Sequence, residues 1–173
     1  MPTVSANPPH FDSGTPDLDG SLTAYSYFTP SEPVLIELID ELFGKNWAHI
    51  TVGPCIEGAV FEIRFTHAPE IRISDGYLTV DLGPWHFHLC IGAHKSSSSE
   101  LRKMRPVNKI AFFERRGKGC GGGRSWGMRL WNGYGEQMTT IFLPIPISRT
   151  ICSTSKRRTG ANFHSTIGCA NNF

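Results

Sequence analysis

The chain has 173 residues, the usual size of one domain, and it is long enough to bury a sizeable core without disulfides or metals. Its 39% apolar and 18% charged residues, together with 18 Gly and 12 Pro, exclude helical bundles, coiled coils and collagen-like repeats. The net charge of +2 excludes no class of partner by itself. No apolar run approaches the ~20 residues of a membrane helix, and residues 1–10 lack a signal segment. These two features predict a cytoplasmic protein without membrane spans.

The first predicted element is an extended arm over residues 1–28, which contain four Pro and no sustained apolar period. Aromatic residues near its end are expected to anchor it: Tyr25, Tyr27 and Phe28.

A helix is predicted next, because residues 29–32 (TPSE) have the spacing of a capping box with Pro at the first helical position. An apolar stripe that ends before Gly44 supports this helix. Its members are Val34, Leu35, Leu38, Ile39, Leu42 and Phe43.

From residue 47 to residue 92 the apolar period changes to two, which predicts half-buried strands. Asp75-Gly76 is the strongest kind of two-residue hairpin signal, and Gly83-Pro84 marks the turn into a strand over residues 85–91. The pattern therefore predicts an antiparallel meander.

Residues 96–116 predict a second helix, because a serine run supplies an N-cap and apolar residues recur at every third or fourth position. Pro106 is expected to kink this helix. After a glycine-rich loop, residues 126–131 and 138–143 predict two strands joined by a turn whose Asn and Gly tolerate positive φ.

Beyond Pro146 the chain is rich in Ser, Thr, Arg and Asn without an apolar period, so residues 147–173 are predicted to be a loosely attached tail. One hypothesis is that this tail is an alternative end of the coding sequence. We therefore predict a single α+β domain over residues 29–146, in which an antiparallel sheet of five to seven strands carries two helical segments on one face.

The most informative segment for function is the predicted strand PWHFHLCIG at residues 84–92. Alternation directs Trp85, Phe87, Leu89 and Ile91 toward the core and places His86, His88 and Cys90 on the opposite face. Two imidazoles and a thiolate suit Zn or Fe rather than Mg or Ca, with His67 and His94 as spare ligands. Two alternatives stay open: metal-free acid/base chemistry, or histidines that merely occupy a polar sheet face while Cys90 fills a small space.

Further titratable and polar side chains are predicted on the same face: Glu62, Arg64, Tyr77, Thr79 and Asp81. In an enzyme, His86, His88 and Glu62 would be the catalytic acid/base groups.

Arg64 or Arg129 would orient an anionic substrate. Met128 and Leu130 would take the core face, which is expected to place Arg129 on the side of His86 and His88. Arg124 and the glycine-rich loop around Cys120 form a second candidate for anion binding.

The strings PWHFHLCIG and SWGMRLWNGYGEQMTTIFLP resemble segments of a family of small uncharacterised proteins from bacteria and fungi, over residues 30–146. The resemblance implies that this block is a self-contained domain to which the arm and the tail are peripheral. It implies no activity, so no functional residue is carried over from it.

Three functions remain open on these observations. The first is a small enzyme, with or without Zn or Fe, acting on a small anionic or carboxylate-bearing metabolite. The second is a non-catalytic protein that binds a metal, haem or an anionic metabolite with the same face. The third is a protein-interaction module built on residues 95–129, which carry 10 Lys/Arg and 2 Asp/Glu.

Nucleic acid is not favoured as a partner, because no helix-turn-helix, RNP or zinc-finger pattern accompanies the basic residues. Free strand edges are compatible with a homodimer. Five Cys, an odd number without a CxxC pair, predict reduced thiols rather than a disulfide framework.

Overall fold

A computed structural model of the chain describes residues 10–18, 20–56, 58–117 and 123–144. Its elements in chain order are β1 (Thr15–Pro16), β2 (Leu22–Phe28), α1 (Glu32–Ile39), β3 (Thr51–Gly53), β4 (Cys55–Ile56), β5 (Ala59–Val60), β6 (Ile63–Arg64), β7 (Glu70–Ser74), β8 (Tyr77–Asp81), β9 (His86–Cys90), α2 (Ser99–Met104), β10 (Val107–Arg116), β11 (Arg124–Asn132) and β12 (Gln137–Leu143). A π-helical turn over Asp40–Lys45 extends α1, and a 3-10 turn follows at Trp47–His49.

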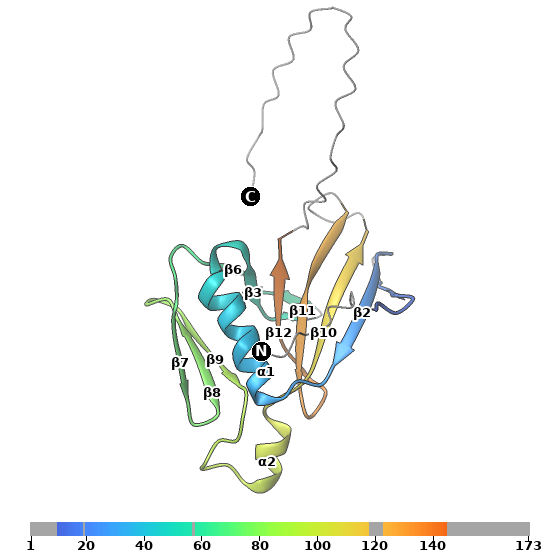
Figure 1. Cartoon of the computed structure of the whole chain (residues 1–173). Coiled ribbons are helices and arrows are strands. Elements are labelled where there is room, and N and C mark those ends of the chain that lie inside the picture. Colours follow the sequence, from blue (N-terminus) through green and yellow to red (C-terminus); the bar gives the residue numbers. More distant parts are fainter. Residues whose placement is uncertain (1–9, 19, 57, 118–122, 145–173) are drawn as a thin grey trace, which may run out of the picture.

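Two sheets with α1 between them make up the body of the fold (Figure 1). The larger sheet has seven strands in the order β1-β2-β10-β11-β12-β3-β6, the smaller has the order β7-β8-β9, and β4 with β5 forms a separate hairpin. Every pairing is antiparallel. The predicted α+β class, with one domain, an antiparallel sheet and two helices, is confirmed.

The core fills the space between the inner faces of the two sheets. Phe43, in the π-helical turn, is 1% exposed, and its ring lies 5.9 Å from that of Phe65 and 5.8 Å from that of Phe87. Phe43 therefore connects the helix to β9 and to the segment that follows β6. Around it lie buried residues from α1 and both sheets: Leu35, Ile39, Val52, Leu78, Val80, Leu89, Ile110, Met128, Leu130 and Ile141.

The first helix begins two residues later than the capping-box pattern predicted. Its N-cap is Ser31, whose side chain makes no capping hydrogen bond, and Pro33 rather than Pro30 occupies the first turn. Most of the predicted apolar stripe is buried, but Val34 is 45% exposed because only one narrow side of the helix meets the core.

The predicted second helix is wrong over most of its length. Only Ser99–Met104 is helical, and residues 107–116 form β10 between β2 and β11. Four consecutive apolar residues of β10, 110–113, lie against structure on both faces of the sheet, so the strand lacks the alternation that marks a half-buried one. Pro106 ends the helix instead of kinking it.

Part of the predicted N-terminal arm is a strand of the larger sheet. Residues 22–28 form β2, and β2 pairs with β10 from Ile110↔Phe28 to Arg116↔Leu22. The alternating Thr23, Tyr25 and Tyr27 were the available signal, but Pro and Gly in the preceding residues obscured it. The predicted tail, residues 147–173, lies outside the described residues.

The predicted hairpin turn at Asp75-Gly76 is confirmed. It joins β7 to β8, and both residues have positive φ, 48° and 77°, as a type I′ turn requires. Among the described residues, no helix has the length and apolar character needed to span a membrane.

An ion-pair cluster on β10 gives a first testable prediction. Glu114, 8% exposed, accepts hydrogen bonds from Arg116 and Arg124, each with an N–O distance of 2.7 Å. The hydrogen bond from Arg116 and the charge of Arg124 outweigh the effect of burial and lower the pKa of Glu114 below its ordinary 4.5. Because the folded-state pKa is lowered, the carboxylate stabilises the fold above pH 4.5, and this contribution is lost as the pH falls through the lowered pKa.

We expect Glu114→Gln to lower the free energy of unfolding by about 1–3 kcal/mol at pH 7 and by progressively less below about pH 4, measured by urea titration. Glu70→Gln is the matched control, since the Glu70 side chain is 69% exposed and lies 3.8 Å from Arg72. If Glu114→Gln lowered the free energy of unfolding equally at pH 7 and at pH 3, the stabilisation could not come from the ionised Glu114 carboxylate.

Candidate functional site

The two histidines of β9 lie on the outer face of the smaller sheet. Strand register pairs Thr79 with His88 and Asp81 with His86, so these four side chains share one face, as the alternation predicted. His88 Nδ1 lies 2.8 Å from Thr79 Oγ1, and the rings of His86 and His88 meet edge-on with 5.2 Å between centroids. Both histidines are exposed.

The third predicted ligand, Cys90, is buried, unlike the two histidines of the same strand. It is 5% exposed, its thiol donates to the carbonyl oxygen of Gly92 at 3.4 Å, and burial raises the pKa of the thiol. Within the described ranges, no three His, Cys, Asp or Glu side chains lie close enough together to hold a metal. A metal held by His86, His88 and Cys90 therefore stays a prediction.

The three predicted arginines belong to the larger sheet, and Glu62 lies in the segment between β5 and β6. Arg64 lies on β6, where it pairs with Thr51, and Arg129 lies on β11 between the buried Met128 and Leu130, which face the core. Arg124 is bound to Glu114 and covers the ring of Trp126 at 5.5 Å.

The predicted single pocket of histidines and arginines is consequently not formed. Alternation fixes which residues share a face only within one sheet, and here two sheets pack with their apolar faces toward a common core. Their polar faces therefore point in opposite directions, with His86 and His88 on one and Arg129 on the other.

A pocket of about 680 Å³ lies on the outer face of the larger sheet, and we call it the Arg129 pocket. Its floor consists of side chains from β10, β11 and β12: Arg115, Arg129 and Gln137. The turn before β2 forms one wall, with Pro16, Asp17 and Leu18, and the β4–β5 hairpin forms the other, with Cys55, Ile56 and Val60. The pocket thus joins segments more than 100 residues apart in the sequence.

Arg129 is held by aromatic side chains rather than by a carboxylate. Its guanidinium carbon lies 5.5 Å from the ring centroid of Tyr25 and 5.0 Å from that of Phe113, and its Nη1 donates a hydrogen bond to Tyr25 Oη. Gly127 permits this packing, because a Cβ there would lie 2.6 Å from the Phe113 ring. Among the described residues, the buried Nε of Arg129 has no hydrogen-bond partner.

The second arginine of the pocket is neutralised by the chain. Arg115 Nε donates to Ser21 Oγ at 2.9 Å and lies 3.3 Å from Asp17 Oδ2. Burial would raise the pKa of Asp17, but hydrogen bonds from Thr23 and Ser21, together with Arg115, hold it below its ordinary value. Asp17 is therefore ionised and balances Arg115, which leaves Arg129 as the uncompensated charge among the lining residues.

Neutral polar groups lie in the pocket, as Cys55 and Gln137 do, or beside it, as Tyr25 does through its contact with Arg129. Burial raises the pKa of Tyr25 and of Cys55, so both are protonated near neutral pH. Glu62 and Arg129 both act electrostatically on Cys55, so two of the predicted site residues do lie near a common group. Gln137 Nε2 donates to the backbone oxygen of Cys55 and to Thr140 Oγ1, which fixes the hairpin wall.

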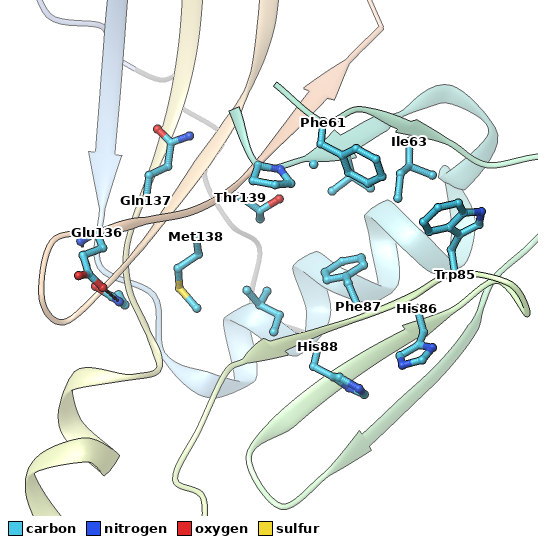
Figure 2. A pocket seen from close by; sticks show the side chains of 15 residues that line it. Phe61, Ile63, Trp85, His86, Phe87, His88, Glu136, Gln137, Met138 and Thr139 are labelled. Atoms are coloured by element: carbon cyan, nitrogen blue, oxygen red, sulfur yellow. Dashed lines mark hydrogen bonds between the residues drawn. The ribbon is translucent and has the colours of Figure 1, made fainter. Parts of the chain in front are cut away.

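A second cavity, of about 450 Å³, lies between β9 and the β3 and β12 strands (Figure 2). We call it the inter-sheet cavity. Figure 2 shows Phe87 on the cavity side of β9, whereas His86 and His88 point to the opposite side. Trp85, predicted to face the core, is instead 59% exposed and lies at the cavity mouth.

Comparison with known proteins identifies a family and a partial structural likeness. The model of a family of unknown function, DUF7676, matches residues 14–163, which extends beyond the 30–146 block into the predicted arm and tail. No curated protein matches the chain. A solved chain described as "Crystal structure of ChuX" is similar at a TM-score of 0.44 and 15% identity over 68% of this chain, which spans 62% of the length of that chain.

Proposed function

This chain belongs to DUF7676, a family of unknown function, and we propose that it binds a small carboxylate- or phosphate-bearing molecule in the Arg129 pocket. One observation carries the proposal: the buried Nε–H of Arg129 has no partner among the described residues, and no described carboxylate forms an ion pair with this guanidinium. Partly burying a charge costs free energy unless a counter-charge and hydrogen bonds compensate for it. A bound anion would supply both.

The geometry of the guanidinium favours a planar or tetrahedral oxyanion. Tyr25 accepts the hydrogen bond of Nη1, and no described residue binds the edge formed by Nε and Nη2, whose two N–H groups point in parallel. Because Nε is buried in the unliganded chain, binding at this edge requires the side chains that cover it to shift. Carboxylates and phosphates bind that edge with two parallel hydrogen bonds. Tyr25 Oη accepts from Arg129, so its own proton can be donated to the ligand.

The charge of the lining favours a monoanion. The charges of Asp17 and Arg115 cancel, so the net charge of the lining residues is +1 at neutral pH. Four basic side chains of the segment 95–129 are also engaged within the chain. Arg115 pairs with Asp17, Arg116 and Arg124 pair with Glu114, and Lys109 lies 4.6 Å from the Trp131 ring centroid. This distribution supports a local anion pocket more than a broad basic interaction surface.

Binding rather than catalysis is the function that these residues support best. The enzyme hypothesis needed His86, His88 and the arginines in one pocket, and the histidines lie on the opposite face of the molecule. Two reactive groups lie near Arg129, but neither is prepared for catalysis: Glu62 is exposed to solvent, and the Cys55 thiol is protonated.

The proposal is tested by titrating the full chain with sodium acetate, sodium benzoate and inorganic phosphate at constant ionic strength, with chloride as the reference anion. We expect one saturable site by calorimetry and a shift of the Arg129 Nε–H signal in a ¹⁵N spectrum, assigned by its loss in Arg129→Gln. The proposal is overturned if no anion saturates, or if binding leaves the Arg129 signal in place.

A further inference from the structure

The inter-sheet cavity differs from the Arg129 pocket in its place and its chemistry. Within the described residues β9 hydrogen-bonds only to β8, so its second edge faces β3 and β12 across open space (Figure 2). Five consecutive residues, 85–89, line the cavity from this edge. The opposite wall comes from residues 52–54 and 137–139.

The interior of the cavity is apolar. Side chains from both sheets and from the segment between β5 and β6 contribute to it: Val52, Phe61, Ile63, Trp85, Phe87, Leu89 and Met138. Glu136 is the only Asp, Glu, Lys or Arg among the lining residues. Three of the polar side chains in the lining have a partner: Asn132 binds Glu136, Gln137 binds Cys55 and Thr140, and His88 binds Thr79.

Two exposed aromatic rings lie together at the cavity mouth. Trp85 is 59% exposed and Phe61 is 49% exposed, and their ring centroids are 6.1 Å apart. Both rings line the same cavity although they come from distant segments, Phe61 from the residues before β6 and Trp85 from the residue before β9. An open cavity lined mainly by apolar and aromatic side chains is typical of small-molecule binding sites.

We propose that the inter-sheet cavity is a second binding site, which takes a small neutral aromatic molecule stacked against the Trp85–Phe61 pair, with its far end against Phe87 and Met138. The absence of a cation from the lining and the single carboxylate of Glu136 disfavour an anion there. The volume of about 450 Å³ lies in the range typical of small-molecule sites. This site is independent of the anion bound at Arg129.

The test uses the full chain and the neutral fluorescent probe N-phenyl-1-naphthylamine. We expect one probe per chain, quenching of tryptophan fluorescence, and affinity about tenfold weaker in Trp85→Ala and in Phe61→Ala. Both residues are half-exposed, so the variants should remain folded. Met138→Trp should fill the cavity and abolish probe binding. Ile73→Ala is the matched control and should bind the probe normally, because Ile73 lies on β7 and is 45% exposed.

Arg129→Gln should leave probe binding unchanged, which separates this site from the anion pocket. The proposal is overturned if the probe does not bind, or if Trp85→Ala and Phe61→Ala bind it like the unaltered chain. It is also overturned if sedimentation shows a dimer that Trp85→Ala converts to a monomer, because a second copy of the chain would then be the occupant.

Discussion

Replacing Arg129 by Gln is expected to weaken binding of a small carboxylate or phosphate roughly 10- to 100-fold, because charge-assisted hydrogen bonds to an arginine are worth about 1.5–3 kcal/mol. The same change should leave the thermal stability of the unliganded protein nearly unaltered. Gln removes a charge that no described carboxylate balances, and it loses only the contacts with Tyr25 and Phe113. Calorimetry measures the first effect and thermal unfolding without ligand measures the second.

Arg124→Gln is the matched control for this prediction. Arg124 lies on the same strand, β11, but outside the Arg129 pocket, where it pairs with Glu114. We expect unchanged anion binding and a small loss of stability. If Arg124→Gln weakened anion binding as much as Arg129→Gln does, the site would lie nearer the glycine-rich loop that the sequence also suggested. If Arg129→Gln unfolded the protein, Arg129 would be a structural residue.

Phe43→Ala is expected to give the largest loss of stability among these variants. Phe43 is 1% exposed and its ring contacts those of Phe65 and Phe87, so truncation leaves a cavity where the helix meets both sheets. Such changes cost about 3–5 kcal/mol, which for a chain of this length lowers the Tm by roughly 10 °C. Urea and thermal unfolding monitored by circular dichroism measure the loss.

Phe61→Ala removes the same side chain from a half-exposed position and serves as the reference. It should cost less than about 1 kcal/mol, because most of the ring that is removed was not in the core. Equal losses in the two variants would mean that Phe43 does not hold the sheets together.

The elements predicted well were those whose signals are local. The Asp75-Gly76 turn needs positive φ at two successive residues, and few residue pairs tolerate this, so the dipeptide identified the β7–β8 hairpin directly. The orientation of Arg129 was also local, because Met128 and Leu130 on either side of it are strongly apolar and had to face the core.

The elements predicted wrongly were those whose environment is set by distant segments. Residues 110–113 of β10 lie against structure on both faces of the sheet, and no local pattern distinguishes such a strand from a buried helix. Residues 22–28 become a strand because β10 offers an edge, and that edge is formed more than 80 residues later in the chain.

The sequence by itself determined the α+β class, the antiparallel pairing and the alternation that puts His86 and His88 on one face of β9, because these depend on periodicity and turn chemistry within short segments. Only the tertiary structure decided which polar residues share a pocket. Two sheets packed on a common core turn their outer faces apart, so the histidines and Arg129 are separated. The same packing brings Tyr25, Cys55 and Arg129 together from three distant segments, and proximity between residues so far apart in the chain leaves no pattern in a single sequence.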